Sequence, residues 1–130
     1  MVATHQLTVM VVEDSEILRT RWIALLGNIP HLCVTVLATT GLQAWACFAE
    51  ARPDAVVLDV ELDDVNGLQL LGRMKRERPS CRVIVLASYI FEAFHQRCQD
   101  LGADFFLEKA NDFDRVPAIL TAIASATPAA

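Results

Sequence analysis

Charged residues follow three of the most apolar stretches of this chain. Glu13 and Asp14 follow LTVMVV, Asp59 follows AVVL, and Lys109 comes two residues after FFL. If these stretches are neighbouring strands of a parallel sheet, their carboxyl ends share one edge and the charges gather there. Carboxylates at close range need a counter-charge, which a divalent cation and a lysine supply. The residue types therefore predict a metal site suited to phosphoryl chemistry.

Each of these residues also has a simpler interpretation when it is taken alone. An acidic pair after a strand commonly caps a helix, an aspartate at a strand end commonly sits in a turn, and a lysine there is commonly solvated. All of these features would have to coincide at three neighbouring strand ends. The coincidence favours the functional interpretation.

Five short apolar runs alternate with five amphipathic segments along the chain. The runs are continuous, as is typical of strands covered by helices on both faces, and most are rich in β-branched residues. The predicted strands cover residues 7–12, 33–38, 55–58, 82–87 and 104–108.

Capping residues, glycines and prolines bound the five segments between and after the strands. The predicted helices begin at Asp14-Ser15, after Thr39-Thr40, around Asn66-Gly67, near residue 90 and after Asp114. Asp114 is predicted to cap the fifth helix. The second helix is predicted to bury a stripe of four residues: Leu42, Trp45, Ala46 and Ala49.

The order of these elements predicts an α/β fold of the (βα)₅ type. Right-handed crossovers then place helices on both faces of one parallel sheet. We expect a single domain over residues 1–130, with a core of about 6–125 and a frayed tail or linker stub at 126–130.

Composition narrows the classes of function. The chain has 130 residues, 54% of them hydrophobic, which predicts a folded globular body. A net charge of −5 argues against unspecific binding to nucleic acid or an anionic membrane. No apolar run reaches membrane-spanning length, and the N-terminus does not have the pattern of a signal peptide. The four cysteines lack metal-ligand spacing, so we expect reduced thiols in a cytoplasmic protein.

Four segments of the sequence resemble the signature blocks of a known family. MVVEDS, VVLDVELDDVNGL, VIVLAS and GADFFLEK resemble those of the CheY-like receiver domain of response regulators in two-component signalling. The resemblance covers residues 6–125 in the right order. It implies a flavodoxin-like, doubly wound sheet of five parallel strands in the order 2-1-3-4-5.

The resemblance also implies a role for each charged residue. Asp59 would accept a phosphoryl group from the phosphohistidine of a sensor histidine kinase or phosphotransfer protein. Lys109 would bind the phosphoryl group once it is attached. Four residues would hold the cofactor Mg²⁺: Glu13, Asp14, Asp59 and, through its backbone carbonyl, Glu61.

Further roles follow from the same resemblance. Phe106 matches the aromatic residue that moves on activation, and ordinary core packing is the alternative. The surface of the fourth helix, fifth strand and fifth helix would dock partners, with Tyr89 and Phe91 near it, and a homodimer is possible. We expect no membrane binding, no direct nucleic-acid binding and no enzymatic turnover beyond self-catalysed phosphorylation and dephosphorylation.

The sequence departs from the family pattern near the expected site. Ala87 aligns with the switch position that normally carries a hydroxyl, and Ser88 could replace it only through a shift or bulge. The plain register is preferred. Asp63 and Ala110 stand where prolines are common in the family.

These departures leave other functions open. The chief alternative is a phosphorylation-independent receiver that works as a protein-interaction module. A small phosphatase with an aspartate nucleophile is a further alternative, because Asp59-Val60-Glu61 is similar to its D-x-D signature. That fold places the nucleophile after its first strand. A flavodoxin-like cofactor carrier is disfavoured, since no phosphate-binding loop follows the first apolar run.

Overall fold

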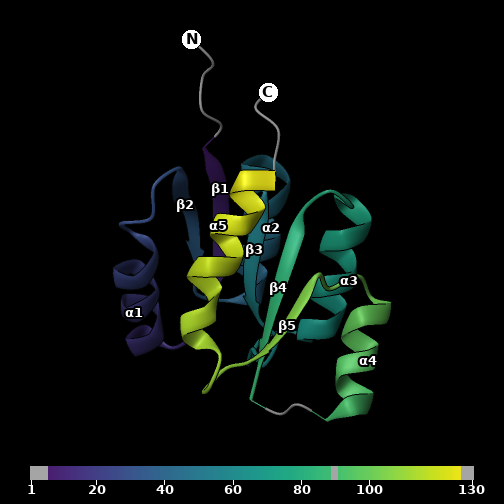
Figure 1. Ribbon diagram of the computed structural model, residues 1–130. Coiled ribbons are helices and arrows are strands. Elements are labelled where there is room, and N and C mark those ends of the chain that lie inside the picture. The colour runs from purple at the N-terminus through teal and green to yellow at the C-terminus, as the bar shows by residue number, and fades with distance from the viewer. Residues whose placement is uncertain (1–5, 89–90, 127–130) are drawn as a thin grey trace.

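The computed structural model describes residues 6–88 and 91–126, which form a parallel sheet covered by helices (Figure 1). The strands are β1 (Leu7–Val12), β2 (Leu32–Ala38), β3 (Ala55–Asp59), β4 (Arg82–Ala87) and β5 (Phe105–Glu108). The helices are α1 (Glu16–Leu26), α2 (Gly41–Ala51), α3 (Gly67–Glu77), α4 (Glu92–Asp100), the 3₁₀ turn η1 (Phe113–Arg115) and α5 (Val116–Ala126). The strand order is β2-β1-β3-β4-β5, which confirms the predicted flavodoxin-like topology.

The register of the sheet brings several strand ends level with one another. Val12, the last residue of β1, pairs with Leu58 of β3, so Glu13 follows β1 beside Asp59. At the other side of β3, Asp59 pairs with Leu86 of β4. The carboxyl ends of the central strands therefore form the edge that the sequence predicts.

Two apolar layers hold the sheet between the helices. Val11 of β1 packs in the same core cluster as Trp22 of α1 and Leu120 of α5. The next residues along the strand face the opposite cluster, which includes Phe48 of α2 and Leu71 of α3. Helices α1 and α5 thus cover one face, whereas α2, α3 and α4 cover the other (Figure 1). This arrangement explains why the strands read as continuous apolar runs.

Side-chain caps fix the starts of the first three helices, as the sequence predicts. The Ser15 hydroxyl accepts a hydrogen bond from the Leu18 N–H at 3.3 Å. The Thr40 hydroxyl accepts one from the Gln43 N–H at 3.0 Å, and the Asn66 side chain caps α3. These bonds satisfy N–H groups that have no partner inside the helix.

The predicted buried face of α2 is wrong. The residues predicted to be buried are exposed or only half-buried: Leu42, Trp45, Ala46 and Ala49. Gly41, Ala44 and Phe48 face the core instead. A Cβ on Gly41 would lie 2.1 Å from a methyl carbon of Val65, so close contact with the β3–α3 connection sets the rotation of the helix.

Asp114 does not cap α5, contrary to the prediction. It lies inside η1, where its carboxylate pairs with Arg21 at 3.3 Å. The turn begins earlier because the ring of Phe113 is buried and stacks on Trp22, with 3.7 Å between ring centroids. The packing of this ring, which local sequence does not reveal, determines where the helical segment starts.

The predicted tail begins one residue too early, because α5 continues through Ala126. The remaining tail residues 127–130, and the predictions made for Tyr89, lie outside the described residues. Within residues 6–88 and 91–126, no helix is long and apolar enough to cross a membrane.

The four cysteines are all free thiols. Cys81 and Cys98 are buried, whereas Cys33 and Cys47 are half-buried. Burial raises the pKa of the Cys81 thiol to about 11, so this group stays protonated and unreactive at neutral pH.

Candidate functional site

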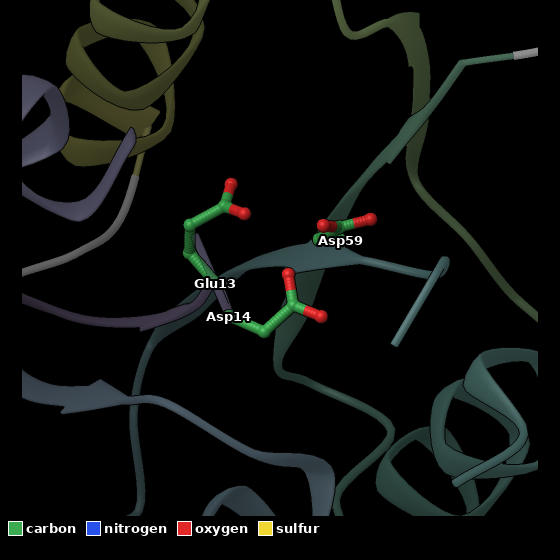
Figure 2. A group of neighbouring side chains, drawn as sticks. All are labelled: Glu13, Asp14 and Asp59. Atoms are coloured by element: carbon green, nitrogen blue, oxygen red, sulfur yellow. The ribbon is translucent and has the colours of Figure 1, made fainter. Parts of the chain in front are cut away.

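Backbone hydrogen bonds position the charged residues at the carboxyl edge of the sheet. The N–H of Glu13 donates to the Ala38 carbonyl at 3.0 Å, and the N–H of Lys109 donates to the Ala87 carbonyl at 2.9 Å. Figure 2 shows Glu13 and Asp14 emerging after β1, with Asp59 at the end of the neighbouring β3. One carboxylate oxygen from each of these three residues lies within 4.8 Å of the others.

Lys109 bridges two buried carboxylates. Its Nζ lies 2.5 Å from Asp59 Oδ2 and 3.1 Å from Glu13 Oε2. Glu13 is 0% exposed and Asp59 is 1% exposed. Burial raises the pKa of Glu13 and the charge of Asp59 adds to this effect, while Lys109 partly offsets it. Burial alone would lower the pKa of Lys109, but its contacts with Asp59 and Glu13 outweigh that effect and raise it, so the lysine stays charged.

Asp14 differs from its neighbours because its carboxylate is open. Among the described residues this carboxylate has no hydrogen-bond or ion-pair partner, and the residue is half-buried. Both oxygens of Glu13, by contrast, already accept hydrogen bonds. Asp14 is therefore the most accessible oxygen ligand of the cluster.

The donor set fits a magnesium ion. Three carboxylates and one ammonium leave an excess of negative charge at the edge. Hard divalent cations such as Mg²⁺ prefer oxygen ligands and are usually bound by one or two carboxylates together with water. The open carboxylate of Asp14 beside Asp59 matches that requirement.

Two residues of α1 support the acidic pair, and sequence reasoning missed both. Arg19 Nη1 donates to the backbone carbonyls of Glu13 at 3.1 Å and Asp14 at 2.8 Å. Trp22 of the core donates its indole N–H to Glu13 Oε1 at 3.3 Å. A signal was present, because a buried tryptophan needs a hydrogen-bond acceptor and the acidic pair Glu13-Asp14 lies just before its helix.

Glu61 connects Asp59 to the end of β4. Its backbone N–H donates to Asp59 Oδ1 at 2.9 Å, which orients that carboxylate. Its own carboxylate accepts a hydrogen bond from the Ser88 N–H at 2.7 Å. Ala87 is buried and pairs with Glu108, and the pairing of β4 with β5 has no bulge. The end of β4 therefore presents the methyl group of Ala87 and the Ser88 N–H, which is bonded to Glu61.

The remaining residues singled out by the sequence lie around this edge. The ring of Phe106 is half-buried and stacks on His95, with 4.4 Å between centroids. Asp63 is exposed in the connection after β3. The peptide bond between Lys109 and Ala110 is trans.

The family model of the response regulator receiver domain matches residues 9–121 of this chain. The chain belongs to the response regulator receiver domain family. The match spans the sheet from the middle of β1 to α5, and so includes every charged residue of the candidate site. It also disfavours the phosphatase interpretation, since Asp59 ends the third strand rather than the first.

Curated relatives of this receiver are longer proteins. It is 32% identical over 108 residues to a protein-glutamate methylesterase/protein-glutamine glutaminase of Treponema pallidum, covering 82% of this chain and 27% of that protein. It is 40% identical over 81 residues to the DNA-binding transcriptional activator DevR/DosR of Mycobacterium tuberculosis, covering 62% and 37% respectively. The matched part of the receiver thus spans well under half of the length of each of these two relatives.

Solved structures share the fold over most of the chain. The response regulator domain of Thermotoga maritima CheB superposes with a TM-score of 0.79 at 26% identity, over 92% of this chain and 94% of that one. The isolated REC domain of RcsB from Salmonella enterica, solved with the phosphomimetic BeF₃⁻, gives a TM-score of 0.84 at 18% identity, over 93% and 90%. The second likeness supports the fold alone.

Proposed function

We propose that this receiver accepts a phosphoryl group on Asp59 from the phosphohistidine of a sensor histidine kinase or phosphotransfer protein. One observation carries the proposal. Asp59 is a buried carboxylate at the end of the central strand, held by Lys109 and adjacent to the open carboxylate of Asp14. Such an arrangement suits an anion that is formed or transferred at this edge.

The chemistry requires neutralisation of charge more than covalent work by the protein. A carboxylate oxygen of Asp59 attacks phosphorus while the bond from phosphorus to the histidine nitrogen breaks. The nitrogen keeps the electron pair of that bond and takes up a proton, and an acyl phosphate remains on Asp59. The N–H of Glu61 orients the attacking carboxylate, and the Lys109 ammonium transfers its contact to a phosphoryl oxygen.

Magnesium would complete this charge balance. Asp14 and Asp59 would contact the ion, with the Glu61 backbone carbonyl as a further ligand and Glu13 assisting through water. When bound, Mg²⁺ supplies positive charge to the transferring phosphoryl oxygens.

The output of the receiver would be protein docking rather than turnover of a substrate. Phosphorylation would alter the face formed by α4, β5 and α5, where Phe106 stacks on His95. The same face would serve a homodimer or an effector. Because the proposed phosphoryl donor is a sensor histidine kinase or phosphotransfer protein, we propose that the receiver acts in the cytoplasm.

A second candidate function is a receiver that docks partners without phosphorylation. Two observations favour it. Ala87 has no hydroxyl to bind a phosphoryl oxygen, and the carboxylate of Glu61 already occupies the Ser88 N–H. An internal carboxylate at this N–H would compete with an incoming phosphoryl group.

Acetyl phosphate and beryllofluoride, each with Mg²⁺, distinguish the two functions. Intact-protein mass spectrometry should show one added phosphoryl group that is lost in Asp59→Asn and retained in Asp63→Asn, an exposed acid of the same region. Beryllofluoride should change the tryptophan fluorescence only when Mg²⁺ is present, because Trp22 contacts Glu13. Absence of an adduct in a chain that binds Mg²⁺ would favour phosphorylation-independent docking.

A further inference from the structure

A groove between α3 and α4 collects three arginines from two helices. Its volume is about 360 Å³, and Arg73, Arg76 and Arg97 line it. All three side chains are exposed. The floor contains the apolar side chain of Leu68 and the backbone of Gly72, where the missing side chain leaves the groove open. Positive charge thus surrounds an apolar floor on the face of the sheet covered by α2, α3 and α4.

Within the described part of the chain, these arginines form no ion pair with an acidic residue. Among the described residues, Arg76 and Arg97 have no hydrogen-bond or ion-pair partner. Arg21 and Arg115, by comparison, each pair with an aspartate. Because acidic residues outnumber basic ones, 16 to 11, unpaired arginines gathered in one groove are unusual for this chain.

One of the guanidinium groups is already positioned. Arg73 lies over the ring of Trp45, with 4.0 Å from Cζ to the ring centroid. A side chain that is held in place loses less entropy on binding, so Arg73 is prepared to meet a ligand. The end of Arg76 lies near Gly72, since a Cβ placed there would be 3.2 Å from Arg76 Nη1.

The helix dipole explains only part of this arrangement. A cation in the last turn of a helix is favourable, and Arg76 and Arg97 both lie in last turns. Lys75 already supplies a cation to the end of α3, where it donates to the backbone carbonyls of Pro79 and Cys81. The dipole does not account for Arg73, which lies earlier in the helix.

We propose that the α3–α4 groove binds an acidic segment of a partner protein that also carries apolar side chains. The guanidinium forks suit the carboxylates of such a segment, and Leu68 offers an apolar contact between them. A protein segment fits better than nucleic acid because the chain as a whole is acidic and would repel an extended phosphate backbone. The inference does not depend on phosphorylation of Asp59.

Binding of a short fluorescein-labelled peptide of Glu and Leu, measured by anisotropy on the unphosphorylated chain, tests the proposal. A peptide with Gln in place of Glu is the ligand control. The double variant Arg76→Gln and Arg97→Gln should weaken binding by about tenfold or more, which corresponds to about 1.4 kcal/mol. Arg97→Gln alone should weaken it by a smaller factor.

The double variant Arg21→Gln and Arg115→Gln provides a matched control with the same change of net charge. These arginines lie on α1 and η1, away from the groove, so binding should stay within about twofold. Equal loss in both double variants would overturn the proposal, because it would show unspecific attraction. Equal binding of the Glu and Gln peptides, or tighter binding of a single-stranded oligonucleotide, would also overturn it.

Discussion

Replacement of Lys109 by methionine tests the charge balance on which the site depends. The substitution keeps most of the aliphatic stem but removes the ammonium that contacts Glu13 and Asp59. Two carboxylates that are at most 1% exposed then lie together without their cation. We expect Lys109→Met to destabilise the fold strongly at neutral pH.

The structure sets the size of this effect. Removal of one partner from a buried ion pair costs about 3–5 kcal/mol. The lysine side chain is 17% exposed, so water offsets part of this cost and the lower end of the range applies. With a urea slope of about 1–3 kcal/mol per molar, the unfolding midpoint should fall by about 1–3 M.

The pH dependence distinguishes this mechanism from a general packing defect. The pKa of Glu13 is raised in the folded state, so the folded chain binds more protons than the unfolded chain above the ordinary glutamate pKa. The free energy of unfolding therefore falls as pH rises from the ordinary glutamate pKa to the raised pKa of Glu13, and it recovers as pH falls. Loss of the ammonium removes the contact that lowers the pKa of Glu13, so this pKa rises further and the deficit of Lys109→Met should shrink between pH of about 8 and about 5.

Urea unfolding followed by circular dichroism at several pH values measures this effect. Lys75→Met is the matched control, since Lys75 is also partly buried, but its partner Asp104 keeps Arg82 as a second cation. The loss of unfolding free energy caused by Lys75→Met should change less with pH. A Lys109→Met deficit below about 1 kcal/mol, or one that is independent of pH, would refute the charge argument.

Three other predictions concern neighbouring contacts. Trp22→Phe removes the indole donor to buried Glu13 and should cost about 1–3 kcal/mol in urea unfolding, with a larger deficit at higher pH. Gly67→Ala should lower the free energy of unfolding by about 1–3 kcal/mol or more, because its Cβ would lie 2.1 Å from the Val60 carbonyl oxygen. Glu61→Ala should change the lifetime of the phosphorylated chain, measured by the decay of the acyl phosphate, since it frees an N–H that a phosphoryl oxygen could use.

Each of these predictions has its own control. Gly72→Ala, in the same helix as Gly67, should cost under about 1 kcal/mol because flexible side-chain ends surround its Cβ and alanine favours helix. Equal losses at the two glycines would contradict the argument from the Val60 backbone. If the loss of stability in Trp22→Phe did not vary with pH, the hydrogen bond from Trp22 would not stabilise the Glu13 carboxylate. Identical decay in Glu61→Ala and the unchanged chain would exclude Glu61 from phosphoryl chemistry.

Local sequence by itself determined the sheet and the position of its charged edge. The apolar runs are continuous and rich in β-branched residues, and each is followed by turn or capping residues. This pattern limits the parallel arrangements to a few, and the resemblance to the receiver family supplied the strand order itself. Glu13, Asp59 and Lys109 come together at the carboxyl edge of the sheet, since each lies at or just beyond a strand end.

Only the tertiary structure decided which side chains of different elements contact one another. The segment of α2 is apolar nearly all round, so its periodicity does not define a buried face, and contact of Gly41 with Val65 selects the rotation. The bonds from Trp22 to Glu13 and from Ser88 to Glu61 join residues on different elements. Such contacts depend on distances across the packed fold, which spacing along the chain does not encode.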